Sequence, residues 1–211
     1  AHHHRRGHFQ VLAIGTALTS VPAMAEMTES LNLNGTTGLI DMPSGDAQSD
    51  ATFSFSTAVV GSVSRTSISF QISERLSGSF RFQTWRDWDA IIPGDGKESD
   101  RSLDIRYQVL KEGNVAPALT IGLIDFTGQG LFSSEYVAAT KTFGDRLKVT
   151  AGLGWGRLGS YGGIGAPFGN RPAVSPTGTP NADQWFRGEA APFAGVEFKI
   201  NDNWTFKGEY S

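Results

Sequence analysis

Cysteine is absent from this chain of 211 residues, and all four histidines lie within its first eight positions. The rest of the chain therefore has neither an imidazole base for a serine or cysteine nucleophile nor a thiol for redox chemistry. It also lacks the two side chains that supply most zinc ligands. We expect a non-enzymatic protein with no metal and no cofactor.

Long apolar runs and an excess of basic charge are also missing. The sequence contains no run of about eighteen apolar residues, so a transmembrane helix is not expected. Beyond the N-terminal region, apolar residues do not recur at helical spacing over several turns, which argues against long helices. Acidic residues outnumber basic ones by 21 to 18, and a protein with a net negative charge is poorly suited to binding nucleic acid phosphates. We therefore expect no nucleic acid partner.

The first 25 residues have the order of features that is typical of a secretory signal peptide. A basic pair, Arg5-Arg6, precedes an apolar run over residues 9–18, and Ala23-Met24-Ala25 forms a small-x-small cleavage site. We predict that residues 1–25 direct export. Residues 26–50 should then form an irregular, turn-rich leader that lies against the first strands.

The most prominent pattern in the chain is alternation. In residues 147–156, LKVTAGLGWG, apolar residues fall on every second position, with polar residues or glycines between them. This period of two indicates a β-strand with unlike faces. With residues 131–142 and the turn over residues 143–146, the segment predicts a hairpin. The same pattern predicts nine strands, at about residues 52–60, 67–72, 80–85, 103–109, 119–123, 136–142, 147–155, 194–200 and 204–210.

The connections between these strands alternate in length. Every second connection is short, and the connections between those include the three longest, at residues 87–100, 127–130 and 158–183. Alternate connections of an up-and-down antiparallel sheet lie at the same end, so one end has tight turns and the other has long loops. This asymmetry is typical of outer-membrane barrels. We predict an all-β fold in which residues 51–211 form an antiparallel up-and-down transmembrane β-barrel.

The strand count bears on whether this barrel is complete. Bacterial single-chain barrels have an even number of strands, and a sheet in hydrocarbon cannot leave an edge unpaired. Nine strands would leave two open edges. We therefore expect an incomplete barrel in a C-terminally truncated fragment of a longer protein.

Alternation alone does not say which face of the strands is buried. Charged side chains beside many glycines and serines suit a hydrated interior, and the predicted strands have the length of tilted membrane strands. Aromatic residues recur near strand ends, as in interfacial girdles. We therefore place the apolar face toward lipid. The candidate interior residues, which would contact a polysaccharide, are Arg81, Trp85, Asp104, Arg106, Glu135, Lys141, Lys148, Glu197 and Lys199. A soluble β-sandwich or lectin-like barrel is the alternative.

Three patterns suggest other chemistry only weakly. Residues 154–159 match G-x-G-x-x-G, but no helix is predicted after them, and dinucleotide binding requires a helix N-terminus there. An acidic group within residues 95–100 lacks the ligand spacing of an EF-hand. A carboxylate pair such as Asp125 and Glu135 could flank a glycosidic bond, yet mutual compensation of Glu135 and Lys141 inside the barrel is the simpler interpretation.

Five short runs in the chain carry a family resemblance: GLIDMP at 38–43, KESDRSLD at 97–104, GLFSSEY at 130–136, KTFGD at 141–145 and GLGWG at 152–156. Over about residues 34–211 the chain resembles the YjbH family of exopolysaccharide-associated outer-membrane β-barrel proteins. The resemblance implies a large protein tied to the production of capsular or extracellular polysaccharide. Some members are lipoproteins, and this chain departs from them in having no cysteine. The family offers no catalytic motif at these positions.

The sequence therefore predicts a protein of the outer membrane of a Gram-negative bacterium that takes part in export or assembly of a polysaccharide. Its expected partners are the exopolysaccharide, outer-membrane lipid and other polysaccharide-secretion proteins. A general porin for small solutes is the main alternative. A secreted periplasmic carbohydrate-binding protein is a further one, and it would be soluble without detergent.

Overall fold

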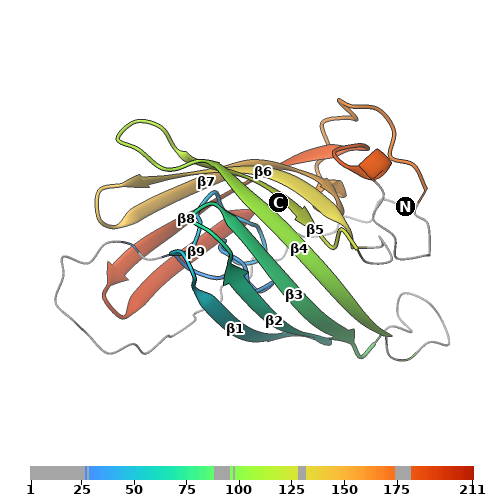
Figure 1. Cartoon of the computed structure of the whole chain (residues 1–211), viewed down its shortest axis with the longest axis horizontal. Coiled ribbons are helices and arrows are strands. Elements are labelled where there is room, and N and C mark those ends of the chain that lie inside the picture. The colour runs from blue at the N-terminus through green and yellow to red at the C-terminus, as the bar shows by residue number, and fades with distance from the viewer. Residues whose placement is uncertain (1–26, 28, 88–95, 97, 128–131, 174–181) are drawn as a thin grey trace, which may run out of the picture.

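A computed structural model of the chain describes residues 27, 29–87, 96, 98–127, 132–173 and 182–211 (Figure 1). The predicted signal peptide, residues 1–25, and the acidic residue Asp95 lie outside these ranges. Within the described ranges, no helix has the length and apolar character needed to cross a membrane.

Nine β-strands form a single antiparallel sheet, and each strand pairs with its neighbours in sequence. The prediction of an all-β, nine-stranded, up-and-down sheet is confirmed. Helix is confined to two three-residue 3-10 turns in the described part of the chain, at Arg157–Gly159 and Ala182–Gln184. The strands are β1 (Phe53–Val60), β2 (Val63–Gln71), β3 (Leu76–Trp85), β4 (Glu98–Leu110), β5 (Ala118–Ile124), β6 (Ser134–Phe143), β7 (Leu147–Gly156), β8 (Ala190–Asn201) and β9 (Trp204–Tyr210).

The two ends of the sheet differ in their connections. At the turn end, Gly144-Asp145-Arg146 joins β6 to β7, and Gly144 takes a φ of 65° that suits glycine. The pair Asp202-Asn203 joins β8 to β9 at the same end. The connections from β3 to β4, β5 to β6 and β7 to β8 are longer and lie at the opposite end, which we call the loop end.

The apolar face of the sheet is its exposed face. Phe53 is 67% exposed, Phe206 43% and Ile105 36%, and Leu153 is half-buried. Polar residues at the intervening positions are buried, as in β4, where Ser102 and Arg106 lie beneath the sheet. This is the reverse of a soluble sheet, in which the apolar face is packed into a core. The prediction that the apolar side looks outward and the polar side lines an interior is confirmed.

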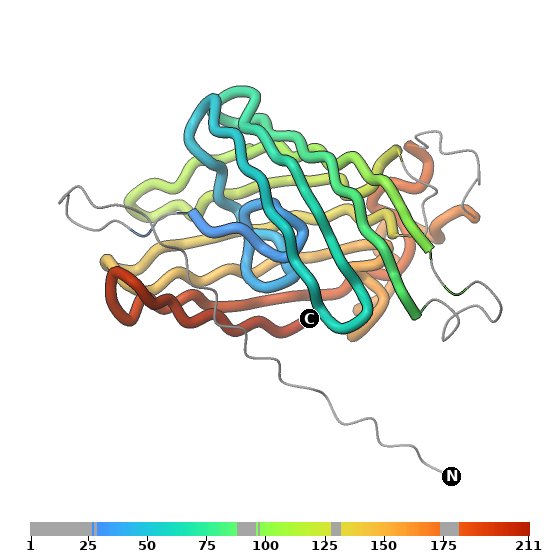
Figure 2. Tube along the Cα trace, turned by 90° about the horizontal axis from the view of Figure 1, so that it is seen from below, coloured from blue at the N-terminus to red at the C-terminus, as the bar shows by residue number. Residues whose placement is uncertain are grey.

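The sheet curls strongly, so that its polar face becomes the inside of a trough (Figures 1 and 2). Strands β1 and β9 are its two edges, and they do not pair with each other among the described residues. These nine strands therefore do not close into a barrel, and the sheet has the two open edges that were expected of it. The interior is instead occupied by residues that precede β1, drawn in blue inside the curl in Figure 2.

Candidate functional site

Residues 30–48, which we call the plug segment, thread through the interior of the curled sheet. Near one end of the segment, Ser30 donates a hydrogen bond to Glu197 of β8. In the middle of the segment, Asp41 reaches Arg157, which directly follows β7 at the loop end. Further on, Asp46 reaches Lys148 at the start of β7, near the turn end. The segment therefore runs along the interior and turns back before β1 begins. The leader was expected to lie against the first strands. It contacts β1 and β2 through Gln48 and Asp41, and it also contacts strands on the other side of the curl, such as β7 and β9.

The plug segment is held in shape by local hydrogen bonds rather than by regular secondary structure. The Asn32 side-chain oxygen accepts the N–H groups of Asn34 at 3.0 Å and Thr36 at 3.2 Å, as asparagine does in tight turns. Gly35 sits in this turn with a φ of 77°, a conformation that favours glycine. Short β-bridges join Leu31 to Thr37 and Gly38 to Pro43.

Strand β9 holds the plug segment with one carboxylate and one ammonium group. Glu209 accepts hydrogen bonds from the backbone N–H groups of three consecutive plug residues, 40–42, at 2.9 to 3.1 Å. Lys207 donates to the carbonyls of Gly38 and Leu39, both at 2.9 Å. Buried backbone groups outside helices and sheets need such partners. Two charged side chains therefore satisfy five backbone groups.

Arg106 of β4 binds the opposite side of the plug segment. Its guanidinium donates to the carbonyl oxygens of Thr37 at 3.1 Å, Ser44 at 3.0 Å and Asp46. The Asp46 carboxylate in turn pairs with Lys148 at 2.8 Å. The Arg106 and Lys148 side chains are both buried, and hydrogen bonds from charged donors are the stronger kind.

Gly45 is the point of closest approach between the plug segment and the sheet. Its carbonyl accepts hydrogen bonds from Gln108 at 2.9 Å and Thr120 at 2.7 Å, and its N–H donates to Thr140 at 2.8 Å. A Cβ at this position would lie 2.5 Å from the Ala118 carbonyl oxygen, so only glycine fits. The residues that grip the plug segment form what we call the anchoring wall: Arg106, Gln108, Thr120, Thr140, Lys148, Lys207 and Glu209.

A second ionic contact fixes the plug segment near the loop end. The Asp41 carboxylate lies 3.2 Å from Arg157 and 3.4 Å from Arg65, and it accepts a hydrogen bond from Asn34 at 3.1 Å. Burial of the Asp41 carboxyl raises its pKa, but the charges of Arg157 and Arg65, with the hydrogen bonds from Arg157 and Asn34, outweigh burial and hold the pKa below its ordinary value.

Among the described residues, apolar packing inside the curl forms one small cluster around the plug segment. Leu39 sits against Gly195, where a Cβ would lie 2.5 Å from the leucine side chain, and the Tyr136 ring fills the space above Gly122. Glycines in the wall thus make room for larger groups. The members of the cluster are Leu39, Met42, Ile124, Tyr136, Ala138, Leu158 and Phe193.

The wall formed by β2, β3 and the middle of β4 differs from the anchoring wall. The strand register aligns two rows across these strands, Ser67–Arg81–Ser102 and Ser69–Ser79–Asp104. We call these six residues the hydroxyl wall. Arg81 pairs with Asp104 at 3.0 Å, and Ser79 donates to the same carboxylate at 3.1 Å. All six side chains are buried, yet none hydrogen-bonds the plug segment within the described residues.

Four buried polar atoms of the hydroxyl wall have no hydrogen-bond partner in the described part of the chain. They are the hydroxyl oxygens of Ser67, Ser69 and Ser102 and the Nε of Arg81. Leaving such a group unpaired in a folded protein costs about 1–3 kcal/mol. The hydroxyl wall therefore has hydrogen-bonding capacity that the described residues do not use.

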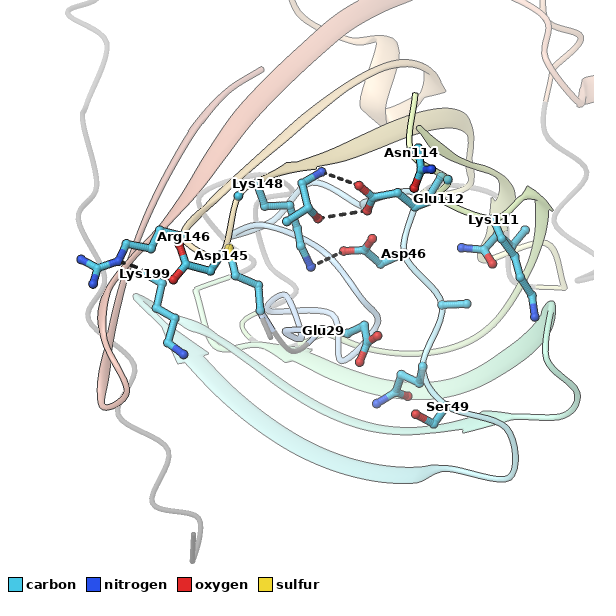
Figure 3. Close-up of a pocket in the computed structure, with 18 of the residues that line it drawn as sticks. Glu29, Asp46, Ser49, Lys111, Glu112, Asn114, Asp145, Arg146, Lys148 and Lys199 are labelled. Carbon is cyan, nitrogen blue, oxygen red and sulfur yellow. Dashed lines mark hydrogen bonds and ion pairs between the residues drawn. The ribbon is translucent and has the colours of Figure 1, made fainter. Parts of the chain in front are cut away.

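A wide cavity opens at the turn end, below the plug segment (Figure 3). Its volume is about 1510 Å³, and its lining carries charges of both signs, including Glu29, Lys111 and Lys199. The Asp46–Lys148 pair lies at its inner side, and Glu112 accepts hydrogen bonds from Thr142 at its rim. The cavity has the size and polarity of a hydrated vestibule.

The structure places most of the sequence-predicted candidate residues on the inner face. Arg81 and Asp104 pair with each other in the hydroxyl wall, and Arg106 and Lys148 belong to the anchoring wall. Glu197 is buried beside Lys207 at 3.6 Å, and Lys199 lines the turn-end cavity. Trp85 lies at the loop end of β3 and stacks on Phe132 of the β5–β6 connection, with ring centroids 4.5 Å apart.

Glu135 and Lys141 are the exceptions, and their interpretation as compensating interior groups is corrected. Both alternate with Tyr136 and Thr140, which point inward, so they belong to the outer face of β6. Lys141 lies at the turn end and pairs with Glu112 at 2.8 Å. Glu135 lies at the loop end and pairs with Arg171 at 2.7 and 3.0 Å. Their charges are thus compensated by separate connections.

The connection from β7 to β8 folds over the outer face at the loop end. Trp155 occupies an outward position, yet it is buried by Phe186 at 5.2 Å and Phe168 at 6.1 Å between ring centroids. Arg171 fixes this cover to Glu135. No pattern in the sequence pointed to this arrangement, because the connection has no periodicity.

Several functional side chains were placed on the polar face by sequence analysis without being singled out. Lys207 and Glu209 are the main examples, and their partners in the plug segment lie about 170 positions earlier in the chain. Among the described residues, no group of His, Cys, Asp and Glu side chains is arranged to hold a metal ion.

Comparison with known proteins gives the chain a family. The family model YjbH, described as exopolysaccharide biosynthesis protein YbjH, matches residues 30–211. The chain therefore belongs to the YjbH family. It is similar to the uncharacterized lipoprotein YjbH of Escherichia coli (strain K12), with 26% identity over 200 residues. That match covers 89% of this chain and 28% of the relative, so the chain spans less than a third of the relative's length. No solved structure matches the chain.

Proposed function

We propose that this chain is part of an outer-membrane β-barrel protein that takes part, without catalysing a reaction, in export or assembly of an extracellular polysaccharide. The substrate class is supported by membership of a family described as taking part in exopolysaccharide biosynthesis. The observation that carries the membrane placement is the inverted sheet, with an exposed apolar face and a buried polar face.

Free energy favours lipid over water for the outer face. Leaving one large apolar side chain in water rather than burying it forgoes about 1.5–3 kcal/mol, and every strand except β7 exposes at least one such side chain. Strands of 7 to 13 residues are compatible with tilted membrane strands. Phe143 and Trp204 are exposed at the turn end, where an interfacial aromatic girdle would lie.

The proposal requires that the edges of β1 and β9 be paired, because hydrocarbon offers no partner for free backbone groups. They would pair with each other or with further strands of a longer protein. In the proposed orientation the tight turns and the turn-end cavity face the periplasm, as short turns do in outer-membrane barrels. A polymer that arrives from the periplasm would meet this hydrated vestibule first.

The plug segment argues against a permanently open porin. It fills the interior along its length, and ion pairs fix it near the turn end, between Asp46 and the buried Lys148, and near the loop end, between Asp41 and Arg157. In planar bilayers we expect the full-length protein to show little conductance for small ions, and removal of residues 30–48 should raise that conductance. A large steady conductance of the intact protein would favour the porin.

The cellular test is deletion of the gene followed by measurement of secreted polysaccharide. We expect polymer outside the cell to fall and to recover when the full-length gene is returned, with the protein in the outer-membrane fraction. An unchanged amount and chain length of secreted polymer in the deletion strain would contradict the export role. Recovery of the mature protein in the soluble periplasmic fraction would contradict the membrane placement.

A further inference from the structure

The hydroxyl wall has hydrogen-bonding capacity that the folded chain leaves unused. Ser67, Arg81 and Ser102 stand side by side on three neighbouring strands, and each has a buried polar atom without a partner in the described chain. Ser69 adds a fourth such atom in the next row. Buried polar groups are nearly always paired in native proteins, so four in one patch indicate an absent partner.

The plug segment covers this patch without bonding to it. Gly35 lies so close to the wall that a Cβ would be 2.5 Å from the Ser67 Cβ and from the Ser56 hydroxyl oxygen. A void of about 10 Å³ remains between Thr36, Thr37 and the Ser69 and Ser79 side chains. That is the space of roughly one water molecule, which is too little to satisfy all four atoms.

The chemistry of the patch is that of a hydroxyl binder rather than an ion binder. Its two charged members, Arg81 and Asp104, neutralise each other at 3.0 Å. Serine hydroxyls can each donate and accept, as sugar hydroxyls do. Further along β3, on the same inner face, the Trp85 ring stacks on Phe132 at the loop end, and aromatic faces suit the apolar faces of sugar rings.

We propose that the hydroxyl wall binds the hydroxyl groups of an uncharged stretch of polysaccharide, and that residues 34–36 of the plug segment, which precede the Thr37 carbonyl held by Arg106, cover it until the polymer displaces them. This inference rests on the proposed function for its ligand class. The asymmetry of the interior gives the direction of movement, because the plug segment is bonded to the anchoring wall and only rests on the hydroxyl wall. The polymer would then lie between the plug segment and β2–β4. The contacts of Asp41 with Arg65 and of Gln48 with Gln71, which join the plug segment to β2 on either side of the hydroxyl wall, would have to open for the polymer to pass.

The first test compares binding with stability in the full-length protein purified in detergent. The triple variant Ser67→Ala, Ser69→Ala and Ser102→Ala removes hydroxyls that have no partner in the described chain, so its thermal midpoint should be unchanged or higher. Its affinity for maltohexaose, measured by calorimetry, should fall about tenfold or more, because three neutral hydrogen bonds are lost. The variant Ser134→Ala, on the inner face of β6, is the matched control and should leave the affinity unchanged.

Three results would overturn the inference. They are equal affinity of the triple variant and the wild type, absence of saturable maltohexaose binding by the wild type, and binding of hexagalacturonate in preference to the neutral sugar. The first two would mean that the unpaired groups hold water only. The third would mean that the ligand is recognised by charge rather than by its hydroxyl groups.

The second test follows the plug segment directly and does not depend on the triple variant folding. The given sequence contains no cysteine, so Thr36→Cys introduces a single thiol in it beside the hydroxyl wall. Maltohexaose should raise the rate at which this thiol reacts with a maleimide. Ser44→Cys, on the side held by Arg106, should react at an unchanged slow rate. If the thiol of Thr36→Cys reacts with the maleimide at the same rate with and without maltohexaose, the sugar does not displace the plug segment, and the inference is contradicted.

These tests separate the inference from the proposed function. If deletion of the gene leaves secreted polysaccharide unchanged while the triple variant loses maltohexaose affinity, the export role fails and the binding site stands. If deletion abolishes secretion while the wild type binds no neutral sugar, the export role stands and the site fails.

Discussion

The anchoring wall and the hydroxyl wall differ in whether they form hydrogen bonds with the plug segment. The anchoring wall binds the backbone of the plug segment at most positions from 37 to 46, as Glu209 does for residues 40–42 and Arg106 for three carbonyls. The hydroxyl wall is also polar, and all six of its side chains are buried, yet it gives the segment no hydrogen bond among the described residues. The difference teaches that burial of polar groups inside the sheet serves two purposes, one structural and one still open for a ligand.

The largest difference in stability between the two walls is expected from two substitutions on β4. Arg106→Ala leaves three buried carbonyls of the plug segment without their charged donor, so the free energy of unfolding should fall by roughly 3 kcal/mol. Ser102→Ala, four residues earlier on the same inner face, should change it by less than about 0.5 kcal/mol. Pulse proteolysis of the full-length protein measures both. Equal losses for the two variants would remove the distinction between the walls.

Two glycines of the plug segment sharpen the comparison, one at each wall. At Gly45 a new Cβ would meet the Ala118 carbonyl at 2.5 Å, and a strand backbone cannot give way, so Gly45→Ala should cost about 1–3 kcal/mol of stability. At Gly35 the clash is with the Ser67 and Ser56 side chains, and its φ of 77° adds strain.

The plug segment can relieve the Gly35→Ala clash by lifting off the hydroxyl wall, because no hydrogen bond holds it there. We therefore expect faster hydrogen exchange in residues 34–36 with little change at residues 44–46. Gly45→Ala should show the reverse distribution. Hydrogen exchange that rises evenly over the whole plug segment in both variants would contradict the account.

A smaller effect is expected from the ionic contact at the loop end. Because Arg157 and Arg65 hold the Asp41 pKa below its ordinary value of 3.8, the folded state binds this proton less readily than the unfolded state. The stabilisation is therefore complete above about pH 3.8 and is lost as the pH falls through the lowered pKa. Hydrogen exchange of residues 38–43 should accelerate over that acidic range. Asp41→Asn should remove this dependence, and exchange that is equally pH-dependent in both proteins would argue against the ion pair.

Much of the fold could be predicted because its signals are local. Period-two alternation placed all nine strands and, except in β6, their inward and outward faces, and it needs only neighbouring residues such as Leu147 and Lys148. The face of β6 was harder to assign, because Tyr136 and Thr140 look no more interior in sequence than Glu135 and Lys141. The charged residues Glu135 and Lys141 were assigned to the interior because of their charge. That assignment was wrong, because each lies near an end of the strand, where a connection supplies a partner of opposite charge, Arg171 for Glu135 and Glu112 for Lys141.

The plug segment shows what local patterns cannot give. Residues 38–46, GLIDMPSGD, have no periodicity, and their partners are scattered over the six strands β2, β4, β5, β6, β7 and β9. Glu209 and Lys207 look like ordinary polar-face residues until the curl of the sheet brings them to Ile40 and Gly38. Contacts between segments so distant in the chain depend on the curl of the whole sheet.

The most direct measurement of the central claim is the environment of successive β4 positions in the full-length protein in outer membranes. Nitroxide labels on single cysteines at positions 103 to 108, one at a time, report collisions with oxygen, which concentrates in lipid. The account predicts high oxygen accessibility at 103, 105 and 107, and low accessibility at 104, 106 and 108, where the wall and plug segment bury the label. High accessibility to a water-soluble nickel complex at 103, 105 and 107, with no oxygen contrast, would contradict a lipid-facing apolar surface.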